Sequence, residues 1–176
     1  MKPKQYYFVL VGILSLAWSN IALADQIASF LLPSGVKVEI TEKPFQKSLF
    51  KIIGCDRQTA CIINKQVPMG TDVEIPKTLV SSIKISYHGS VYFLDSSDMY
   101  NAWGNRPLER KGVVRYFGGQ CSDTKNCQFR GLFSDGAGTF VAEWKIIDGV
   151  SIRTVLTNSD DVVNLFFKYI DPPEYN

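Results

Sequence analysis

Four cysteines are the residues of this 176-residue chain whose chemistry the sequence predicts most directly. They form two pairs, Cys55 with Cys61 and Cys121 with Cys127, and five residues lie between the members of each pair. Four cysteines allow three disulfide connectivities. We favour bonds within the two pairs, because each bond would then close a short polar loop between strand-like flanks. Each disulfide is expected at the end of a β-hairpin.

Metal and thiol chemistry are the alternatives for these cysteines. A zinc site needs closer cysteine spacing or several histidines, and His88 is the only histidine of the chain. The sequence GGQC at 118–121 is similar to the surroundings of a thiol nucleophile, but a Cys121 that is held in a disulfide has no thiolate for attack. We therefore predict no metal and no cofactor.

The sequence contains no recognisable catalytic motif. It lacks a G-x-S-x-G elbow, an H-E-x-x-H pair and a glycine-rich phosphate loop after a strand. His88 precedes Gly89, where a turn residue that accepts positive φ is expected, so a catalytic triad has no base. Any two of the 17 acidic residues could still meet as general acid and base. The prediction is a protein that is not an enzyme, and a hidden carboxylate pair is the main alternative.

The N-terminal residues predict export. Lys2 and Lys4 precede an apolar run at 6–18, and an A-x-A cleavage site ends at Ala24. A membrane-spanning helix needs about 20 apolar residues, more than this run offers. We expect a signal peptide over residues 1–24, cleavage after Ala24, a single globular domain over residues 25–176, a periplasmic location and no membrane attachment.

The charge balance argues against nucleic acid as a partner. The chain has 19 basic and 17 acidic residues, and two of the basic residues are leader lysines. The mature protein is therefore close to neutral, and its basic residues are scattered rather than clustered. Binding to nucleic acid needs a basic surface, so we expect none.

Alternating apolar residues predict the elements that position these groups. A hairpin over 81–94 with a two-residue turn at His88 and Gly89 would pair Ile85 with Tyr92. The DSSD sequence at 95–98 predicts a cap before a short helix over 99–103, and a second helix is expected between Ser159 and Pro172. The expected fold class is a β-rich α+β fold: a largely antiparallel curled sheet or partly open barrel, with two disulfides and a C-terminal helix packed on it.

The register of the last hairpin, near residues 140–156, can also be predicted. A two-residue turn at Asp148 and Gly149 would pair Trp144 with Arg153 and place the two apolar sets on opposite faces. A three-residue loop over 147–149 would pair Trp144 with Ile152 and restore one apolar face. We therefore predict the three-residue loop.

The leader ending in ALA, the bridged loops and the segment GTFVAEWKIIDGVSIRTVLTNSDDVVNLFFKYIDPPEY at 138–175 point to a class of proteins. Together they resemble the small periplasmic immunity proteins that are encoded beside toxins of bacterial type VI secretion systems, and the similarity is strongest from about Gly112 onward. The resemblance implies a protein that binds a cognate peptidoglycan-acting toxin and blocks its active site. The alternatives are an envelope structural or adhesive subunit, and a peptidoglycan-binding module or hydrolase.

An inhibitor of this kind needs a rigid protrusion, because ordering a loop on binding costs affinity. The loops at 56–60 and 122–126 would provide one. We expect the partner to contact either the second loop, through Asp123 and Lys125, or the segment that carries Tyr100, Trp103 and Arg106. In the alternative interpretation Trp103 lies in the core.

Overall fold

The computed structural model describes residues 25–56, 58–103, 112–134 and 136–172. The expected signal peptide and Arg106 lie outside these ranges. Among the described residues the strands are β1 (Gln26–Leu31), β2 (Lys37–Pro44), β3 (Ile52–Ile53), β4 (Ile62–Ile63), β5 (Thr78–Tyr87), β6 (Ser90–Leu94), β7 (Phe117–Cys121), β8 (Cys127–Phe133), β9 (Phe140–Ile147) and β10 (Val150–Thr157). The helices are α1 (Asp160–Lys168) and the 3-10 turns Lys47–Leu49, Val113–Tyr116 and Gly136–Gly138. No described helix combines the length and apolar character that crossing a membrane requires.

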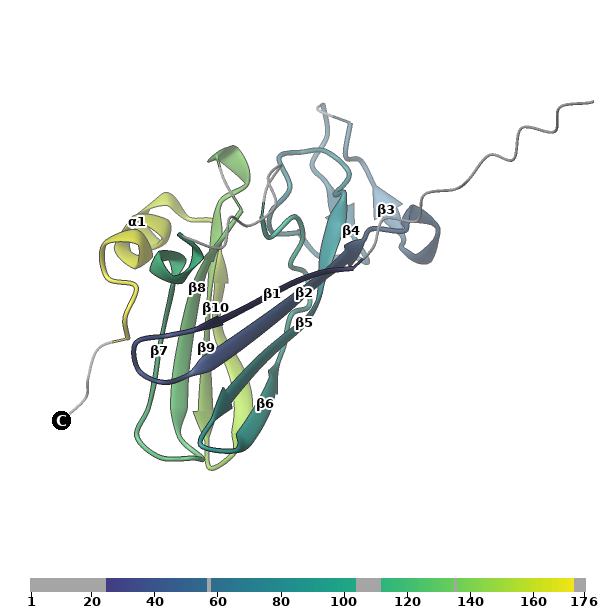
Figure 1. Cartoon of the computed structure of the whole chain (residues 1–176). Coiled ribbons are helices and arrows are strands. Elements are labelled where there is room, and N and C mark those ends of the chain that lie inside the picture. The colour runs from purple at the N-terminus through teal and green to yellow at the C-terminus, as the bar shows by residue number, and fades with distance from the viewer. Residues whose placement is uncertain (1–24, 57, 104–111, 135, 173–176) are drawn as a thin grey trace, which may run out of the picture.

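The strands form two four-stranded antiparallel sheets and one small hairpin. The first sheet has the order β1-β2-β5-β6, the second β10-β9-β8-β7, and β3 pairs with β4. Figure 1 shows the two larger sheets facing each other and α1 beside the second sheet, where it contacts β8 and β9. The prediction of a β-rich antiparallel fold with a C-terminal helix on the sheet is confirmed. The described strands do not close into a barrel, and the expected curl of the sheet stays a prediction.

The main core lies between the two sheets. Alternation along β2 turns Val38 and Ile40 inward, and alternation along β9 does the same for Trp144 and Ile146. The opposite face of the second sheet packs against Phe166 of α1. Strand β9 is therefore buried on both faces, which explains why it is apolar almost throughout.

The predicted register of the β9–β10 hairpin is wrong. Asp148 (φ 51°) and Gly149 (φ 84°) form a two-residue turn, and Trp144 pairs with Arg153. β10 is an edge strand, and its outer face is exposed, as Val150 with 62% exposure shows. The apolar residues of β10 can therefore lie on both faces of the strand. A bulge between Arg153 and Val155 then shifts the register, so that Leu156 lies opposite Ala142 and packs against the main core.

The first hairpin is confirmed and the first helix is not. Ile85 pairs with Tyr92 across a turn in which His88 has a φ of 44°. Residues 99–103 form no helix, because Met99 and Tyr100 use their backbones in bridges to neighbouring segments. The Val80 N–H donates to the Met99 carbonyl at 2.9 Å, and the Tyr100 N–H donates to Met69 at 2.9 Å. These tertiary hydrogen bonds take the place of the backbone hydrogen bonds of the short helix that the DSSD sequence predicted.

Gly118 marks the place where the chain after α1 crosses the second sheet, and it carries a testable prediction. A Cβ atom at Gly118 would lie 2.7 Å from the carbonyl carbon of Ile170 and 2.8 Å from the Cα of Asp171. Backbone cannot yield as a flexible side chain does, so Gly118→Ala is expected to lower the free energy of unfolding by about 1–3 kcal/mol in urea denaturation. Gly112→Ala is the control, because a Cβ there meets nothing within 4 Å. Equal losses in the two variants would contradict this packing.

Candidate functional site

The two disulfides join Cys55 to Cys61 and Cys121 to Cys127, as predicted. Cys121 and Cys127 are register partners at the end of the β7–β8 hairpin, with Cα atoms 4.0 Å apart. The other bond closes the β3–β4 hairpin, with Cα atoms 4.1 Å apart. Figure 1 shows the two bridged loops at opposite ends of the molecule.

The loop between Cys121 and Cys127, here called the tip loop (122–126), is ordered by one carboxylate. Asp123 accepts hydrogen bonds from the Lys125 N–H at 2.7 Å, the Asn126 N–H at 2.9 Å and the Asn126 side-chain amide at 2.9 Å. The Asn126 side-chain hydrogen bond and the Lys125 backbone N–H lower the pKa of Asp123 below that of an ordinary aspartate. The carboxylate is thus occupied inside the loop, where it fixes the backbone.

Two neighbouring hairpins support the tip loop. The Tyr92 hydroxyl on β6 donates to the carbonyl of Thr124. From the β9–β10 turn, the Gly149 N–H donates to the Lys125 carbonyl at 2.9 Å, and the Asp148 N–H donates to the Asn126 side chain at 3.1 Å. Figure 1 shows these hairpin turns together at one end of the sheets. Thr124 and Lys125 therefore have exposed side chains on a backbone that is fixed by hydrogen bonds within the loop and to two neighbouring hairpins.

An apolar pair lies beside the tip loop. Ile147 and Val150 face each other across the β9–β10 turn and are 50% and 62% exposed. We call Thr124, Lys125, Ile147 and Val150 the tip surface. It combines apolar area with a polar apex, which is the composition of many protein interfaces.

The other predicted contact segment lies elsewhere. Tyr100 is 5% exposed, and its ring packs edge-on against Phe45 at 5.7 Å. Trp103 is half-buried and packs against the main core, with its ring centroid 6.1 Å from that of Phe117. Of the predicted contact residues that the structure describes, Asp123 and Lys125 are the exposed ones.

Two buried glutamates hold elements together. Glu42 accepts from the Thr78 hydroxyl at 2.6 Å and the Ala102 N–H at 2.7 Å, and burial raises its pKa. Glu143 pairs with Arg130 at 2.5 Å beneath α1. Burial raises the pKa of Glu143, but hydrogen bonds from Thr154 and Arg130, together with the Arg130 charge, bring it below the usual value.

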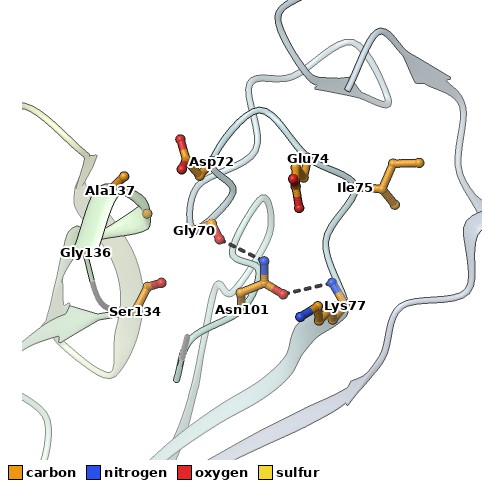
Figure 2. Close-up of a pocket in the computed structure, with 10 residues that line it drawn as sticks. Gly70, Asp72, Glu74, Ile75, Lys77, Asn101, Ser134, Gly136 and Ala137 are labelled. Atoms are coloured by element: carbon orange, nitrogen blue, oxygen red, sulfur yellow. Dashed lines mark hydrogen bonds between the residues drawn. The ribbon is translucent and has the colours of Figure 1, made fainter. Parts of the chain in front are cut away.

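A cleft of about 450 Å³ opens at the end of the molecule away from the tip loop. Its lining, shown in Figure 2, includes Asp72, Glu74, Lys77, Asn101 and Ser134. These residues come from segments that are far apart in the sequence, and no local signal indicated that the segments meet. Among the described residues, no group of three or more His, Cys, Asp or Glu side chains is placed to hold a metal ion.

Comparison with known proteins places the chain in no group. No family model matches it, and neither do the curated proteins or the solved structures with which it was compared.

Proposed function

We propose that this protein is an exported immunity protein that binds a peptidoglycan-acting toxin in the periplasm and blocks its active site. The observation that carries the proposal is the tip loop, a short protrusion closed by the Cys121–Cys127 disulfide. The resemblance of the sequence to periplasmic immunity proteins supports the same function. In this proposal the tip surface enters or covers the substrate cleft of the toxin.

The physical basis of the proposal is the order of the tip loop before binding. Immobilising a flexible side chain or loop at an interface costs roughly 0.5–1.5 kcal/mol for each side chain that is fixed. Asp123 and the Gly149 N–H hold the backbone around Lys125 in the free protein. The loss of backbone conformational entropy therefore occurs during folding and not on binding. Contacts of Thr124 and Lys125 with the toxin can then contribute almost fully to affinity.

The proposal is tested with the mature protein, starting at Asp25, and the exported peptidoglycan-acting enzyme that the proposal expects to be encoded beside it. The two proteins are mixed, and complex formation is measured together with release of fragments from isolated peptidoglycan. We expect a stable complex and loss of peptidoglycan cleavage. Cleavage that continues in the presence of excess mature protein would contradict the proposal.

The contribution of the tip surface can be measured separately. Lys125→Ala is expected to raise the Kd for the enzyme about tenfold, because a few residues that become desolvated near the centre of an interface carry most of its energy. Thr124→Ala is expected to raise it less, since threonine is under-represented among such residues. Gln58→Ala in the other bridged loop is the matched control, since Gln58 is also exposed between paired cysteines. A larger loss of affinity for Gln58→Ala would show that the other bridged loop, and not the tip loop, contacts the enzyme.

A further inference from the structure

We propose that the cleft at the other end of the molecule is a saccharide-binding site. The site, here called the polar cleft, lies between the loop at 70–77 on one side and Ser134 with the turn Gly136–Gly138 on the other, and Asn101 is at its base. It shares no residue with the tip surface. The inference does not rest on the proposed inhibition of a toxin.

The base of the polar cleft is fixed by one side chain. The Asn101 carbonyl oxygen accepts from the Lys77 N–H at 2.9 Å and the Thr78 N–H at 3.2 Å, and its amide donates to the Gly70 carbonyl at 2.9 Å. Two of these hydrogen bonds are drawn in Figure 2. Asn101 therefore ties together both ends of the loop that forms one wall.

Both walls are braced from outside the cleft. Glu74 forms a backbone bridge with Asp56, which adjoins the disulfide-bonded Cys55, so the β3–β4 hairpin supports the first wall. The second wall is joined to the base, because the Ser134 N–H donates to the Ala102 carbonyl at 2.5 Å. The walls approach each other closely at the bottom, where a Cβ on Gly138 would lie 3.3 Å from the Gly70 carbonyl oxygen. The cleft is thus formed in the free protein.

The backbone around the cleft adopts costly conformations. Val73, Asn101 and Ser134 have φ values of 52°, 43° and 64°. Left-handed conformations are strained in most residues other than glycine, although Asn adopts them more readily, and strained residues are often found at binding sites. Val73 is the least expected of the three, because its side chain is β-branched. Val73 lies between Asp72 and Glu74, which both line the cleft.

The lining determines the kind of ligand. Figure 2 shows Asp72 and Glu74 on one wall, the Ser134 hydroxyl on the other and Lys77 near the base. Carboxylates only accept hydrogen bonds, an ammonium group only donates them, and a hydroxyl does both. A ligand that hydrogen-bonds to Asp72 on one wall and to the Ser134 hydroxyl on the other must offer donors and acceptors side by side, as the hydroxyls of a sugar do. A simple cation would match the carboxylates and be repelled by Lys77.

The size of the cleft agrees with a small ligand. Pockets for small molecules typically enclose roughly 300–1,000 Å³, and the polar cleft measures about 450 Å³. No aromatic side chain is among its described lining residues. Recognition would therefore depend on hydrogen bonds, and we expect the affinity to be sensitive to the loss of a single one.

The test is a titration of the 15N-labelled mature protein with tri-N-acetylchitotriose, followed by NMR. Saturable shifts are expected at the backbone amides of Gly70, Gly136 and Gly138, and none at those of Thr124 and Lys125. Ser134→Ala and Asp72→Asn are each expected to raise the Kd about fivefold or more. Ala137→Phe, at an exposed lining position, is expected to fill the cleft and abolish the shifts. Asp148→Asn, in the turn beside the tip loop, is the control and should bind as the wild type does.

Several outcomes would overturn the inference. One is the absence of saturable shifts in the wild-type protein. A second is an unchanged Kd in Ser134→Ala, Asp72→Asn and Ala137→Phe, each with a dispersed spectrum of a folded protein. A third is a response to putrescine, a diamine without hydroxyls, in place of the saccharide. Inhibition of the toxin is measured in parallel with the same variants, so that failure of one proposal is distinguished from failure of the other.

Discussion

Replacing Trp144 by alanine is expected to lower the free energy of unfolding by about 3–5 kcal/mol. Trp144 is 0% exposed at the centre of the main core. Its ring stacks on Phe129, with centroids 5.6 Å apart, and meets Phe133 edge-on at 6.2 Å. Both neighbours come from β8 and belong to the core between the two sheets, so they cannot simply move inward to fill the space that the alanine leaves.

The Trp144→Phe variant separates packing from hydrogen bonding. It keeps an aromatic ring on Phe129 but removes the indole N–H, which donates to the Asp95 carbonyl at 2.8 Å. We expect a loss of about 1–2 kcal/mol for this variant. Both values are measured by urea denaturation followed by circular dichroism, because tryptophan fluorescence changes with the substitution itself. If the alanine variant were no less stable than the phenylalanine variant, the packing argument would fail.

Replacing Glu42 by alanine is expected to cost about 2–3 kcal/mol, the second largest effect. Glu42 is 2% exposed and is the acceptor for the Thr78 hydroxyl and the Ala102 N–H. Removing it leaves both donors without that partner, and an unsatisfied buried polar group costs about 1–3 kcal/mol. Thr78 and Ala102 flank the base of the polar cleft, so we expect the loss of saccharide binding in this variant and an unchanged tip loop.

Glu42→Gln tests the charge of the same group. Burial raises the pKa of Glu42 in the folded protein. In the unfolded state the pKa of a glutamate is about 4.3, so the folded state keeps the Glu42 proton to a higher pH than the unfolded state does. The contribution of Glu42 to stability is therefore greatest below that pKa and falls as the pH rises through the pKa of the folded state. Glutamine keeps an acceptor oxygen without this titration.

The glutamine variant is thus expected to be at least as stable as the wild type at pH 7, and to lose the fall in stability between about pH 4 and the raised pKa. The measurement is urea denaturation of both proteins from pH 4 to pH 8. A glutamine variant as unstable as the alanine variant at pH 7 would show that the charge, and not the acceptor, is what the site requires.

Short-range features of this fold could be predicted from the sequence. The two disulfides and the turn at His88 and Gly89 are settled by residues within a few positions of one another, where spacing and backbone preference act directly. The β-rich antiparallel class and the terminal helix follow from the periodicity of apolar residues. The spacing of the paired cysteines likewise predicted the tip loop, and with it Lys125 as a residue expected to contact the partner protein.

Only the tertiary structure decided the features that depend on distant segments. The β9–β10 register follows from β10 lying at a sheet edge, which sequence alternation cannot show. Tyr100 became buried, and no helix formed there, because its backbone pairs with Leu79. The polar cleft brings Asp72, Asn101 and Ser134 together from separate segments, each in an irregular loop without periodicity. Their proximity is set by long-range hydrogen bonds and by the packing of the two sheets, and no local pattern of residues encodes either.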